Sequence, residues 1–387
     1  MIHLSEPSLG GNADTYVRDA LASTFVANGP YVARFEEEFA ARVGAPHVVA
    51  CASGTAAIHL ALHALGVGPG DEVWVSDLTF VASANPARYC GARVTLVDSE
   101  RESWNLDPDV VTDELARRAR SGVAMPAAIV AVHLLGHPAR LGPILDAAAD
   151  HGVPVVEDAA ESLGATWTAQ AGPSVAGREA GTVGTVGCYS FNGNKIMTTG
   201  GGGMVVTGDA ALATRIRHLA TQAKLPGIGY THDEVGFNYR MGNLSAALGV
   251  AQLEQLDGFL ARRRAIADRY AAALAGVGGL AVAPDCVWAR RSGWLSSVMF
   301  EDELARERVR VALEDAGVES RPVWAPLRTQ APYREAPVLG GRVAVEVAER
   351  VLNLPSSATL TGEQQDRVIQ VVRDAVWSRS TPIIGVN

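Results

Sequence analysis

One lysine stands between a strand-like segment and a run of glycines. It is Lys195, in the segment YSFNGNKIMTTGGGG that spans residues 189–203. A lysine amine forms Schiff bases with carbonyl compounds when its surroundings lower its pKa, and glycines let the backbone curve tightly beside a ligand. The residues around Lys195 are short, polar or glycine, unlike those of a solvated charge run. We therefore predict a nucleophilic amine at Lys195, with a surface lysine in a flexible loop as the alternative.

An anion site is predicted where the apolar segment HVVACA ends. Ser53, Gly54 and Thr55 follow that segment and open a helical pattern. The free N–H groups and the positive end of a helix attract a phosphate. Gly54 would let the backbone approach that phosphate, and the two hydroxyls would add donors. An ordinary helix cap without a ligand is the alternative.

A carboxylate pair, Glu157 and Asp158, closes the apolar segment VPVVEDA. A carboxylate at the end of a buried strand needs a partner, because an unpaired buried charge is costly. A protonated pyridine nitrogen would be such a partner, and the pairing would keep the ring electron-withdrawing. The alternative is a structural pair with an arginine or with backbone N–H groups.

The elements that must position these residues follow an alternating pattern. Helix-like and strand-like segments alternate from about residue 14 to 160, which predicts an α/β fold with a mainly parallel sheet covered on both faces. A polar loop at 168–184 precedes two more strands that flank the glycine-rich turn. The pattern at 241–274 is helical for most of its length and could link two domains. Ligands bind at the carboxyl ends of such strands, so the three segments could share one pocket.

Composition limits the class of protein. The formal net charge is −9, which disfavours nucleic acid and anionic membranes as partners. The chain has no signal-peptide pattern at its start and no apolar stretch that could span a bilayer, so we expect a soluble, cytoplasmic protein. No HExxH or CxxC spacing predicts a metal, and the glycine runs lack the context of a nucleotide-binding loop. The four cysteines are scattered and are expected to be free thiols: Cys51, Cys90, Cys188 and Cys286.

Seven motifs occur in a specific order between about Pro30 and Leu360. They are GPYVARFEEEFA, SGTAAIHLAL, GDEVWVSDLTFVASANP, VVEDAAESLGA, CYSFNGNKIMTTGGGGMV, VGFNYRMGNLSAALG and ESRPVWAPL. Together they resemble the DegT-type nucleotide-sugar aminotransferases, which use pyridoxal 5′-phosphate and have the aspartate-aminotransferase (type I) fold. The resemblance implies a large domain, residues 1–255, with a mainly parallel sheet of the seven-stranded type between helices. A smaller C-terminal α+β domain would comprise residues 256–387.

The resemblance implies roles for residues that match the family's motifs. Lys195 would carry the cofactor as a Schiff base, and Asp158 would pair with the pyridine nitrogen. Phe80, in LTFVASAN, matches the aromatic residue that stacks on the ring. Gly54 and Thr55 would hold the phosphate.

Three further residues belong to the implied cofactor site. Ser190, five residues before the lysine, would add a hydroxyl to the phosphate site. Asn238, in GFNYR, matches an asparagine that reaches the phosphate from the other subunit, which implies a homodimer with shared active sites. Nothing local singles out Asn238, and a turn residue is the alternative. Glu161 stands where many 3-amino-sugar enzymes of the family carry glutamine.

The subfamily features favour chemistry at C4 of the sugar. Glu161, the GNK before the lysine and the ESRPVW segment resemble enzymes that act on 4-keto-6-deoxy sugars, including UDP-linked amino-sugar enzymes and perosamine synthases. We predict a ping-pong transfer from L-glutamate to a 4-keto-6-deoxy sugar linked to UDP, GDP or dTDP. Relatives with this segment usually read PLH, whereas this chain has Arg328 in the third position. An arginine there could meet a different phosphate or sugar.

Other functions stay open on the same residues. A 3-keto sugar or cyclitol aminotransferase would use the same machinery. A sugar dehydratase is disfavoured, because the family's dehydratases carry histidine at the lysine position. A non-catalytic regulatory protein that binds pyridoxal phosphate is the alternative from another class. The intact set of Lys195, Asp158 and Ser190 argues against it.

Overall fold

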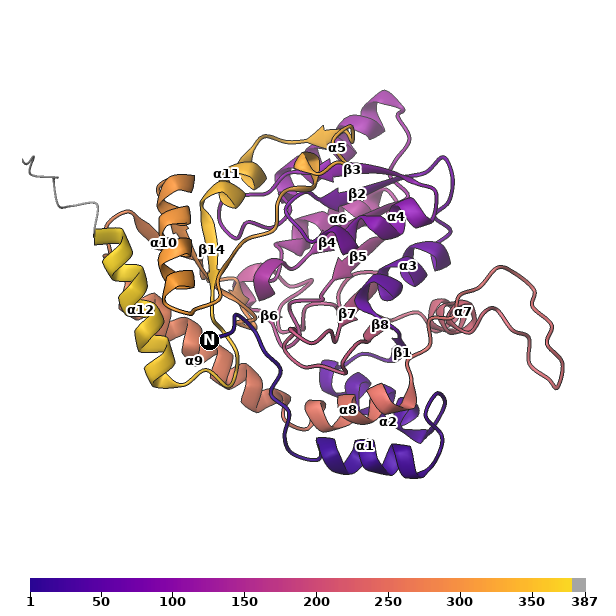
Figure 1. The fold of residues 1–387 in the computed structure, drawn as a ribbon. Coiled ribbons are helices and arrows are strands. Elements are labelled where there is room, and N and C mark those ends of the chain that lie inside the picture. Colours follow the sequence, from indigo (N-terminus) through magenta and orange to yellow (C-terminus); the bar gives the residue numbers. More distant parts are fainter. Residues whose placement is uncertain (378–387) are drawn as a thin grey trace, which may run out of the picture.

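A large sheet forms the centre of the computed structural model, which describes residues 1–377 (Figure 1). Its eight strands, in spatial order, are β1 (His47–Cys51), β8 (Gly203–Thr207), β7 (Val186–Ser190), β5 (Val155–Asp158), β4 (Ala128–Val132), β2 (Glu72–Ser76), β3 (Arg93–Val97) and β13 (Val338–Leu339). Only β8 runs antiparallel to its neighbours, β1 and β7. The predicted α/β fold with a mainly parallel sheet is therefore confirmed. The eighth strand, β13, is a two-residue addition at the β3 edge.

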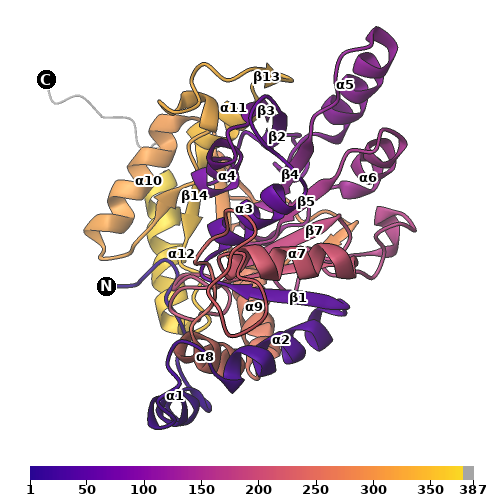
Figure 2. The same ribbon diagram turned by 90° about the vertical axis from the view of Figure 1, so that its right-hand side faces the viewer.

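Helices cover both faces of this sheet (Figures 1 and 2). One face packs against α3 (Gly54–Ala64), α4 (Asn85–Tyr89) and α7 (Ala210–Ala220). The opposite face has α2 (Pro30–Val43) and α8 (Asn243–Leu253) at the β1 end. Near β4, β2 and β3 the same face has α5 (Pro108–Ser121) and α6 (Leu141–Asp150). Strands covered on both sides must be apolar throughout, which explains runs such as AIVAV in β4.

A second, antiparallel sheet lies toward the C-terminus. Its strands, in spatial order, are β12 (Arg321–Pro322), β14 (Val351–Leu354), β11 (Ser296–Phe300) and β9 (Leu280–Val282). It packs on α9 (Leu256–Leu274), α10 (Glu303–Asp315) and α12 (Gly362–Trp377), with α11 (Val343–Arg350) beside it. The remaining elements are α1 (Ala13–Ala22), β6 (Thr166–Trp167), β10 (Ala289–Arg290) and the short 3-10 helices at Val81–Ser83, Leu134–Gly136, Ala169–Ala171 and Leu327–Thr329.

The helical stretch at 241–274 is two helices rather than one. α8 (Asn243–Leu253) and α9 (Leu256–Leu274) are separated by a short break, so the segment is helical for most of its length, as the pattern predicts. The side-chain amide of Gln255 at the junction donates to the carbonyls of Gly10 and Ala251, 3.0 and 2.9 Å away. α8 packs under the large sheet, whereas α9 turns away to the smaller one.

The N-terminal segment of the chain lies beside the smaller sheet. Ile2 forms a parallel bridge with Val318, and the backbone N–H of Glu6 donates to Ser357. The strand β13, from beyond residue 256, joins the large sheet. The division into domains at residue 255 therefore stays a prediction. Within residues 1–377 no helix has the length and apolar character needed to cross a membrane.

Candidate active site

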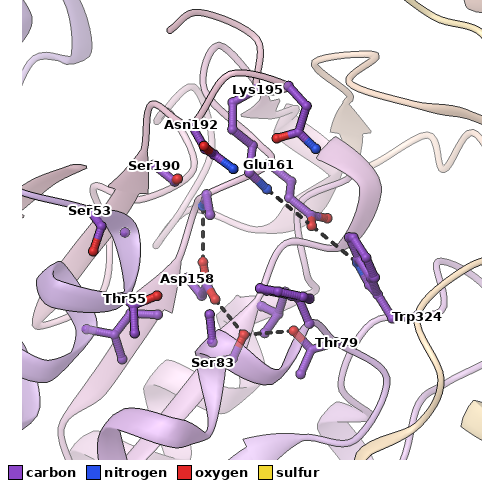
Figure 3. Close-up of a pocket in the computed structure, with 17 residues that line it drawn as sticks. Ser53, Thr55, Thr79, Ser83, Asp158, Glu161, Ser190, Asn192, Lys195 and Trp324 are labelled. Atoms are coloured by element: carbon purple, nitrogen blue, oxygen red, sulfur yellow. Dashed lines mark hydrogen bonds and ion pairs between the residues drawn. The ribbon is translucent and has the colours of Figure 1, made fainter. Parts of the chain in front are cut away.

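A cavity of about 420 Å³ opens at the carboxyl ends of the parallel strands (Figure 3). Seven of the eight predicted site residues line it: Gly54, Thr55, Phe80, Asp158, Glu161, Ser190 and Lys195. They come from loops and strand ends separated by up to 141 positions in the chain, the interval from Gly54 to Lys195. The sheet brings them together because the ends of parallel strands meet at one edge.

Asp158 is a buried carboxylate at the end of β5. Its Oδ2 accepts a hydrogen bond from the Ser83 hydroxyl at 2.6 Å, and its Oδ1 accepts from the Ala160 N–H at 3.1 Å. Thr79 in turn contacts the Ser83 hydroxyl at 2.7 Å (Figure 3). No ion pair to Asp158 is formed by the residues that the structure describes. An unpaired buried carboxylate is costly, so this site fits a cationic ligand group such as a protonated pyridine nitrogen.

The N-terminus of α3 opens into the same cavity. The Ser53 hydroxyl caps the helix by accepting the Ala56 N–H at 3.1 Å. A Cβ on Gly54 would lie 2.7 Å from the Cβ of Ser190, so only glycine lets the end of β7 approach the helix this closely. The first N–H groups of α3 and the hydroxyls of Thr55 and Ser190 therefore gather at the positive end of a helix. This donor set fits a phosphate.

The amine of Lys195 lies between a carboxylate and an aromatic ring. Its Nζ is 3.6 Å from Glu161 Oε1 and 4.2 Å from the centre of the Trp294 ring. Glu161 is buried; its Oε2 accepts the Leu135 N–H at 2.7 Å, and its Oε1 accepts the Trp324 indole N–H at 3.3 Å. Burial raises the pKa of the Glu161 carboxyl, and the nearby charge of Lys195 opposes that shift.

Local strain accompanies the Glu161 contact. Leu135 has a φ of 55°, in the left-handed region that bulky residues rarely adopt. Its N–H points at the Glu161 carboxylate, and the hydrogen bond of 2.7 Å helps to offset the strain. The backbone and the buried carboxylate hold each other in place.

Phe80 lies at the mouth of the cavity. Half of its surface is exposed, and its ring centre is 5.1 Å from that of Trp324. The two rings form an apolar part of the cavity wall; Trp324 is labelled in Figure 3.

Asn238 is the one predicted site residue that does not line the cavity. It is exposed, in an extended segment that bridges to Thr221. The carbonyl of the next residue, Tyr239, accepts the N–H of Ala52 at 2.8 Å. The segment is therefore fixed beside the end of β1, with Asn238 on the surface of this subunit.

Arg328 has a structural role in place of the ligand contact that the sequence allowed. Its Nε donates to Asp77 Oδ2 at 2.6 Å, and its Nη1 donates to the Gly341 carbonyl at 2.6 Å. Nη2 is 3.1 Å from Asp98 Oδ1, an ion pair without the alignment of a hydrogen bond. The idea that this arginine meets a different phosphate or sugar is not supported, because its guanidinium is already engaged.

Sequence reasoning missed the aromatic surroundings of the lysine. Trp294 and Trp324 come from the C-terminal half and reach the site only through tertiary packing. One usable signal was overlooked. The chain contains only two lysines, Lys195 and Lys224, among 33 basic lysine and arginine residues. Such scarcity makes the lysine in a glycine-rich turn conspicuous.

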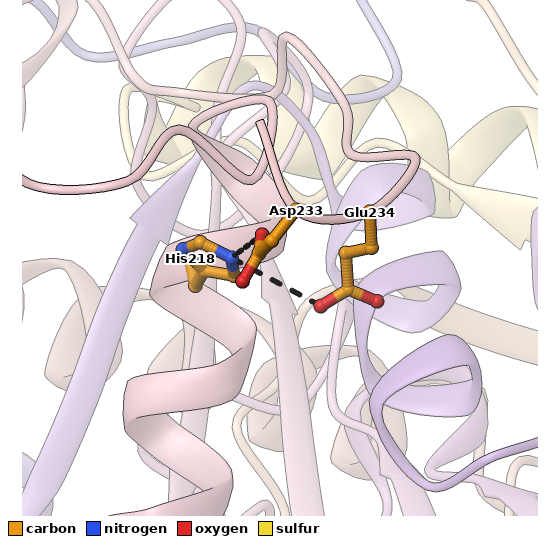
Figure 4. Close-up of side chains that lie close together, drawn as sticks. All are labelled: His218, Asp233 and Glu234. Carbon is orange, nitrogen blue, oxygen red and sulfur yellow. Dashed lines mark hydrogen bonds and ion pairs between the residues drawn. The ribbon is translucent and has the colours of Figure 1, made fainter. Parts of the chain in front are cut away.

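Outside the cavity, the described part of the chain contains one group of side chains that resembles a metal site. His218, Asp233 and Glu234 place one potential ligand atom each within 4.8 Å of the others (Figure 4). However, Arg215 donates to both oxygens of Glu234, at 2.9 and 3.1 Å, and His218 contacts Asp233 at 2.7 Å. The group is a set of ion pairs that anchors the loop at 224–234 to α7.

The comparison with known families agrees with this geometry. The profile of the DegT/DnrJ/EryC1/StrS aminotransferase family matches residues 7–373. The chain belongs to this family. It is therefore an aminotransferase that depends on pyridoxal 5′-phosphate, and its fold and cofactor were predicted correctly.

Relatives extend over nearly the whole chain. EpsN of Bacillus subtilis (strain 168), described as pyridoxal phosphate-dependent, is 40% identical over 96% of this chain and 95% of its own. A GDP-perosamine synthase of Caulobacter vibrioides is 39% identical over 95% of this chain and 96% of its own. Among solved structures, the aminotransferase TlmJ from Streptoalloteichus hindustanus has a TM-score of 0.89 at 31% identity, covering 98% of this chain and 100% of its own. The sugar aminotransferase CalS13 from Micromonospora echinospora has a TM-score of 0.85 at 30% identity, covering 97% and 100%.

Proposed function

We propose that this aminotransferase moves an amino group from L-glutamate to the keto group at C4 of a 4-keto-6-deoxy sugar carried by a nucleotide. The product would be a 4-amino-4,6-dideoxy sugar nucleotide. One observation carries the assignment of the residues. The amine of Lys195, the buried carboxylate of Asp158 and the N-terminus of α3 face one cavity.

The residues divide the chemistry between them. Pyridoxal 5′-phosphate, when bound, supplies an electron sink for the carbanion formed at the amino carbon. Asp158 would hold the pyridine nitrogen protonated, since among the described residues its Oδ atoms accept only from the neutral Ser83 hydroxyl and Ala160 N–H. Lys195 would bind the cofactor covalently, and its amine would serve as the acid and base that moves the proton. Thr55 and Ser190 would hold the phosphate at the end of α3, and Phe80 would pack against the cofactor.

Glu161 contacts the lysine amine, and we propose that it also acts on the sugar. Its carboxyl contacts the lysine amine and the Trp324 indole, which lines the outer part of the cavity. We propose that Glu161 binds at the cofactor and favours C4 of the sugar over C3. An amine at C3 of the product would contradict this role.

The nucleotide is proposed to be guanosine diphosphate. Three relatives, from Caulobacter vibrioides, Escherichia coli O157:H7 and Vibrio cholerae, are GDP-perosamine synthases, with 39%, 36% and 35% identity to this chain. The test is a coupled assay with glutamate as donor and GDP-, UDP- or dTDP-linked 4-keto-6-deoxy sugars as acceptors. We expect the highest kcat/KM with the GDP sugar and an amine at C4. Turnover of a 3-keto sugar or a cyclitol alone would contradict the proposal, and so would a failure of glutamate to convert the cofactor.

We also propose that the active unit is a homodimer. Large apolar side chains are exposed in the segment after α1 and in or directly after the loop at 224–234: Phe25, Val26, Ile228, Tyr230 and Val235. Exposed large apolar side chains are candidates for burial in an association surface. Asn238 lies on the surface next to that loop, where a second copy could receive it as a phosphate ligand.

The same proposal includes a cytoplasmic location. All four cysteines are buried thiols without disulfide partners among the described residues. Burial raises the pKa of the Cys51 thiol to about 12, which keeps it unreactive. Free thiols are typical of a reducing compartment.

A further inference from the structure

α9 contains three consecutive arginines, Arg262, Arg263 and Arg264. The sequence pattern alone would predict a solvated, charged surface for them. The structure turns the middle one, Arg263, into the interior, where only 1% of its surface is exposed. Burial lowers the pKa of Arg263 to about 10, so the guanidinium stays charged at neutral pH. It has no ion pair with a carboxylate anywhere in residues 1–377. A buried cation without an anion needs an explanation.

Backbone carbonyl oxygens, and not a carboxylate, accept the hydrogen bonds of the Arg263 guanidinium. Arg263 Nη1 donates to the Trp294 carbonyl at 2.9 Å and to the Ser356 carbonyl at 2.8 Å. Its Nη2 lies 3.4 Å from the Ser5 hydroxyl and 3.5 Å from the Lys195 carbonyl, both at the outer limit of a hydrogen bond. One side chain thus joins four segments that are far apart in the sequence.

Two of these segments, those of Ser5 and Trp294, also hold the peptide between Asn194 and Lys195. The Asn194 carbonyl accepts hydrogen bonds from the Ser5 hydroxyl and from the Trp294 indole N–H, each at 2.8 Å. The Trp294 ring then lies 4.2 Å from the Lys195 amine. Arg263 therefore contacts both the backbone of the lysine and the residue whose ring faces its amine.

We propose that Arg263 is a positioning residue for Lys195, acting through the backbone of Trp294, the Ser5 hydroxyl and the Lys195 carbonyl. Packing alone does not require it, since a well-packed apolar residue often replaces a buried charge at no loss of stability. A guanidinium is planar and offers several donors in fixed directions, so it can hold segments in a defined relation that an apolar side chain cannot. The role rests on Lys195 as the cofactor lysine, as proposed above.

The adjacent residue provides a matched control. Arg264 is also partly buried, and it also donates to two carbonyls, those of Arg291 at 2.9 Å and Gly164 at 2.7 Å. Neither of these residues lines the active-site cavity. Arg264→Gln removes the same kind of contact from the same helix without touching the lysine segment.

The first measurement follows covalent capture of the cofactor. Pyridoxal 5′-phosphate is added to the apo-protein, and the rise of the visible band gives the rate. We expect Arg263→Met and Arg263→Lys to slow capture about tenfold or more, because lysine keeps the charge but cannot reach all of the acceptors. Ser5→Ala, which removes one hydroxyl near the surface, should slow it two- to fivefold. Arg264→Gln should stay within about twofold of the wild type.

The second measurement needs no cofactor. An amine-reactive reagent labels the apo-protein, and the ratio of label on Lys195 to label on Lys224 is read by peptide mass spectrometry. Only two lysines are present, so each serves as the reference for the other. We expect the ratio to change at least threefold in the Arg263 variants and not in Arg264→Gln.

Each outcome decides the proposal. If folded Arg263→Lys captures the cofactor at the wild-type rate with an unchanged labelling ratio, Arg263 does not position the lysine. If the Arg263 variants fail to fold, Ser5→Ala decides, and wild-type capture by that variant overturns the proposal. If borohydride fixes the cofactor on Lys224 in the wild type, the assignment of the cofactor lysine fails instead, and the two failures are distinguishable.

Discussion

Each of the two lysines of this chain lies close to an aromatic ring, but the surroundings of the two side chains differ. Lys195 Nζ lies 4.2 Å from the Trp294 ring, and Lys224 Nζ lies 4.9 Å from the Tyr230 ring. However, the Trp294 ring is 1% exposed, whereas Tyr230 is 88% exposed. A cation above an aromatic ring is thus no sign of an active site in itself.

The difference lies in what fixes the backbone and what faces the amine. The Lys195 segment is held by hydrogen bonds from Ser5, Trp294 and Arg263, and its amine faces the buried carboxylate of Glu161. Lys224 follows Gln222 and Ala223, which have φ values of 58° and 51°, and opens into the exposed loop. A catalytic amine needs a fixed position and a low-dielectric neighbourhood, and only Lys195 has both.

The difference between the two lysines is tested most directly by replacing each of them in turn with alanine. Lys195→Ala should lose at least a thousandfold in turnover, about 4 kcal/mol in activation free energy, because no other amine faces the cavity. The protein should also lose its yellow colour and its borohydride-stable cofactor. Lys224→Ala should keep both, as measured by absorbance and by peptide mapping after reduction. Cofactor found on Lys224 in the wild type would reverse the roles of the two regions.

A second prediction concerns Asp158, the carboxylate that we propose pairs with the ring nitrogen. Asp158→Asn keeps the shape and the Ser83 contact but removes the charge. Turnover should fall by about a hundredfold or more, at least ~2.7 kcal/mol, while some cofactor remains bound. Single-turnover absorbance with glutamate measures the loss. A reduction of only a few-fold would mean that the ion pair contributes little.

Local signals in the sequence indicated some of the residues that line the cavity. Lys195 and Asp158 line it, and each lies where a strand pattern gives way to polar or glycine residues, which is a local signal. Their catalytic roles stay predictions. Trp294 and Trp324 were missed, because their approach to the lysine depends on how the C-terminal segments pack on the large sheet.

The direction of strands and the ends of helices were also beyond local patterns. The antiparallel course of β8 depends on its pairing with β1, more than 150 positions away. The break between α8 and α9 involves a contact of Gln255 with Gly10. The burial of Arg263 depends on acceptors supplied by four distant segments, so its sequence context could only predict a solvated arginine.

A third prediction concerns Asn238, which lies in the exposed region. It tests whether Asn238 completes the buried active site of a partner subunit. Lys195→Ala and Asn238→Asp subunits should each be nearly inactive as homodimers, the second because a carboxylate against a phosphate is a like-charge contact. In a mixed dimer with shared active sites, both substitutions fall in one active site, and the other active site has neither. Activity per heterodimer should recover to about half of the wild type by this site count.

The control for this experiment is to show that the heterodimer forms. Differently tagged subunits are co-expressed and isolated through both tags, so that only heterodimers are assayed. If heterodimers form and stay inactive, Asn238 serves its own subunit, and the proposal of shared sites is wrong.

The smallest expected effect concerns the anchor of the Lys224 loop. Asp233 contacts the His218 imidazole at 2.7 Å, and this hydrogen bond lowers the pKa of the Asp233 carboxyl (Figure 4). A carboxyl with a lowered pKa in the folded state stabilises that state above its unfolded pKa. The contribution is lost as the pH falls through the folded value. Both groups are solvent-accessible, so the contribution is small and is screened by salt.

Asp233→Ala should therefore loosen the loop and leave the buried lysine unchanged. We expect amide hydrogen exchange at 224–232 to rise about two- to fivefold near neutral pH, as for the loss of an exposed ion pair. After correction for intrinsic exchange, the difference from the wild type should vanish at a pH below the folded pKa of Asp233, where the carboxyl is neutral in the wild type too. The labelling of Lys195 in the same samples should not change. A change at Lys195 would show that the two regions are coupled within one subunit, and the contrast between a fixed lysine and an independent loop would fail.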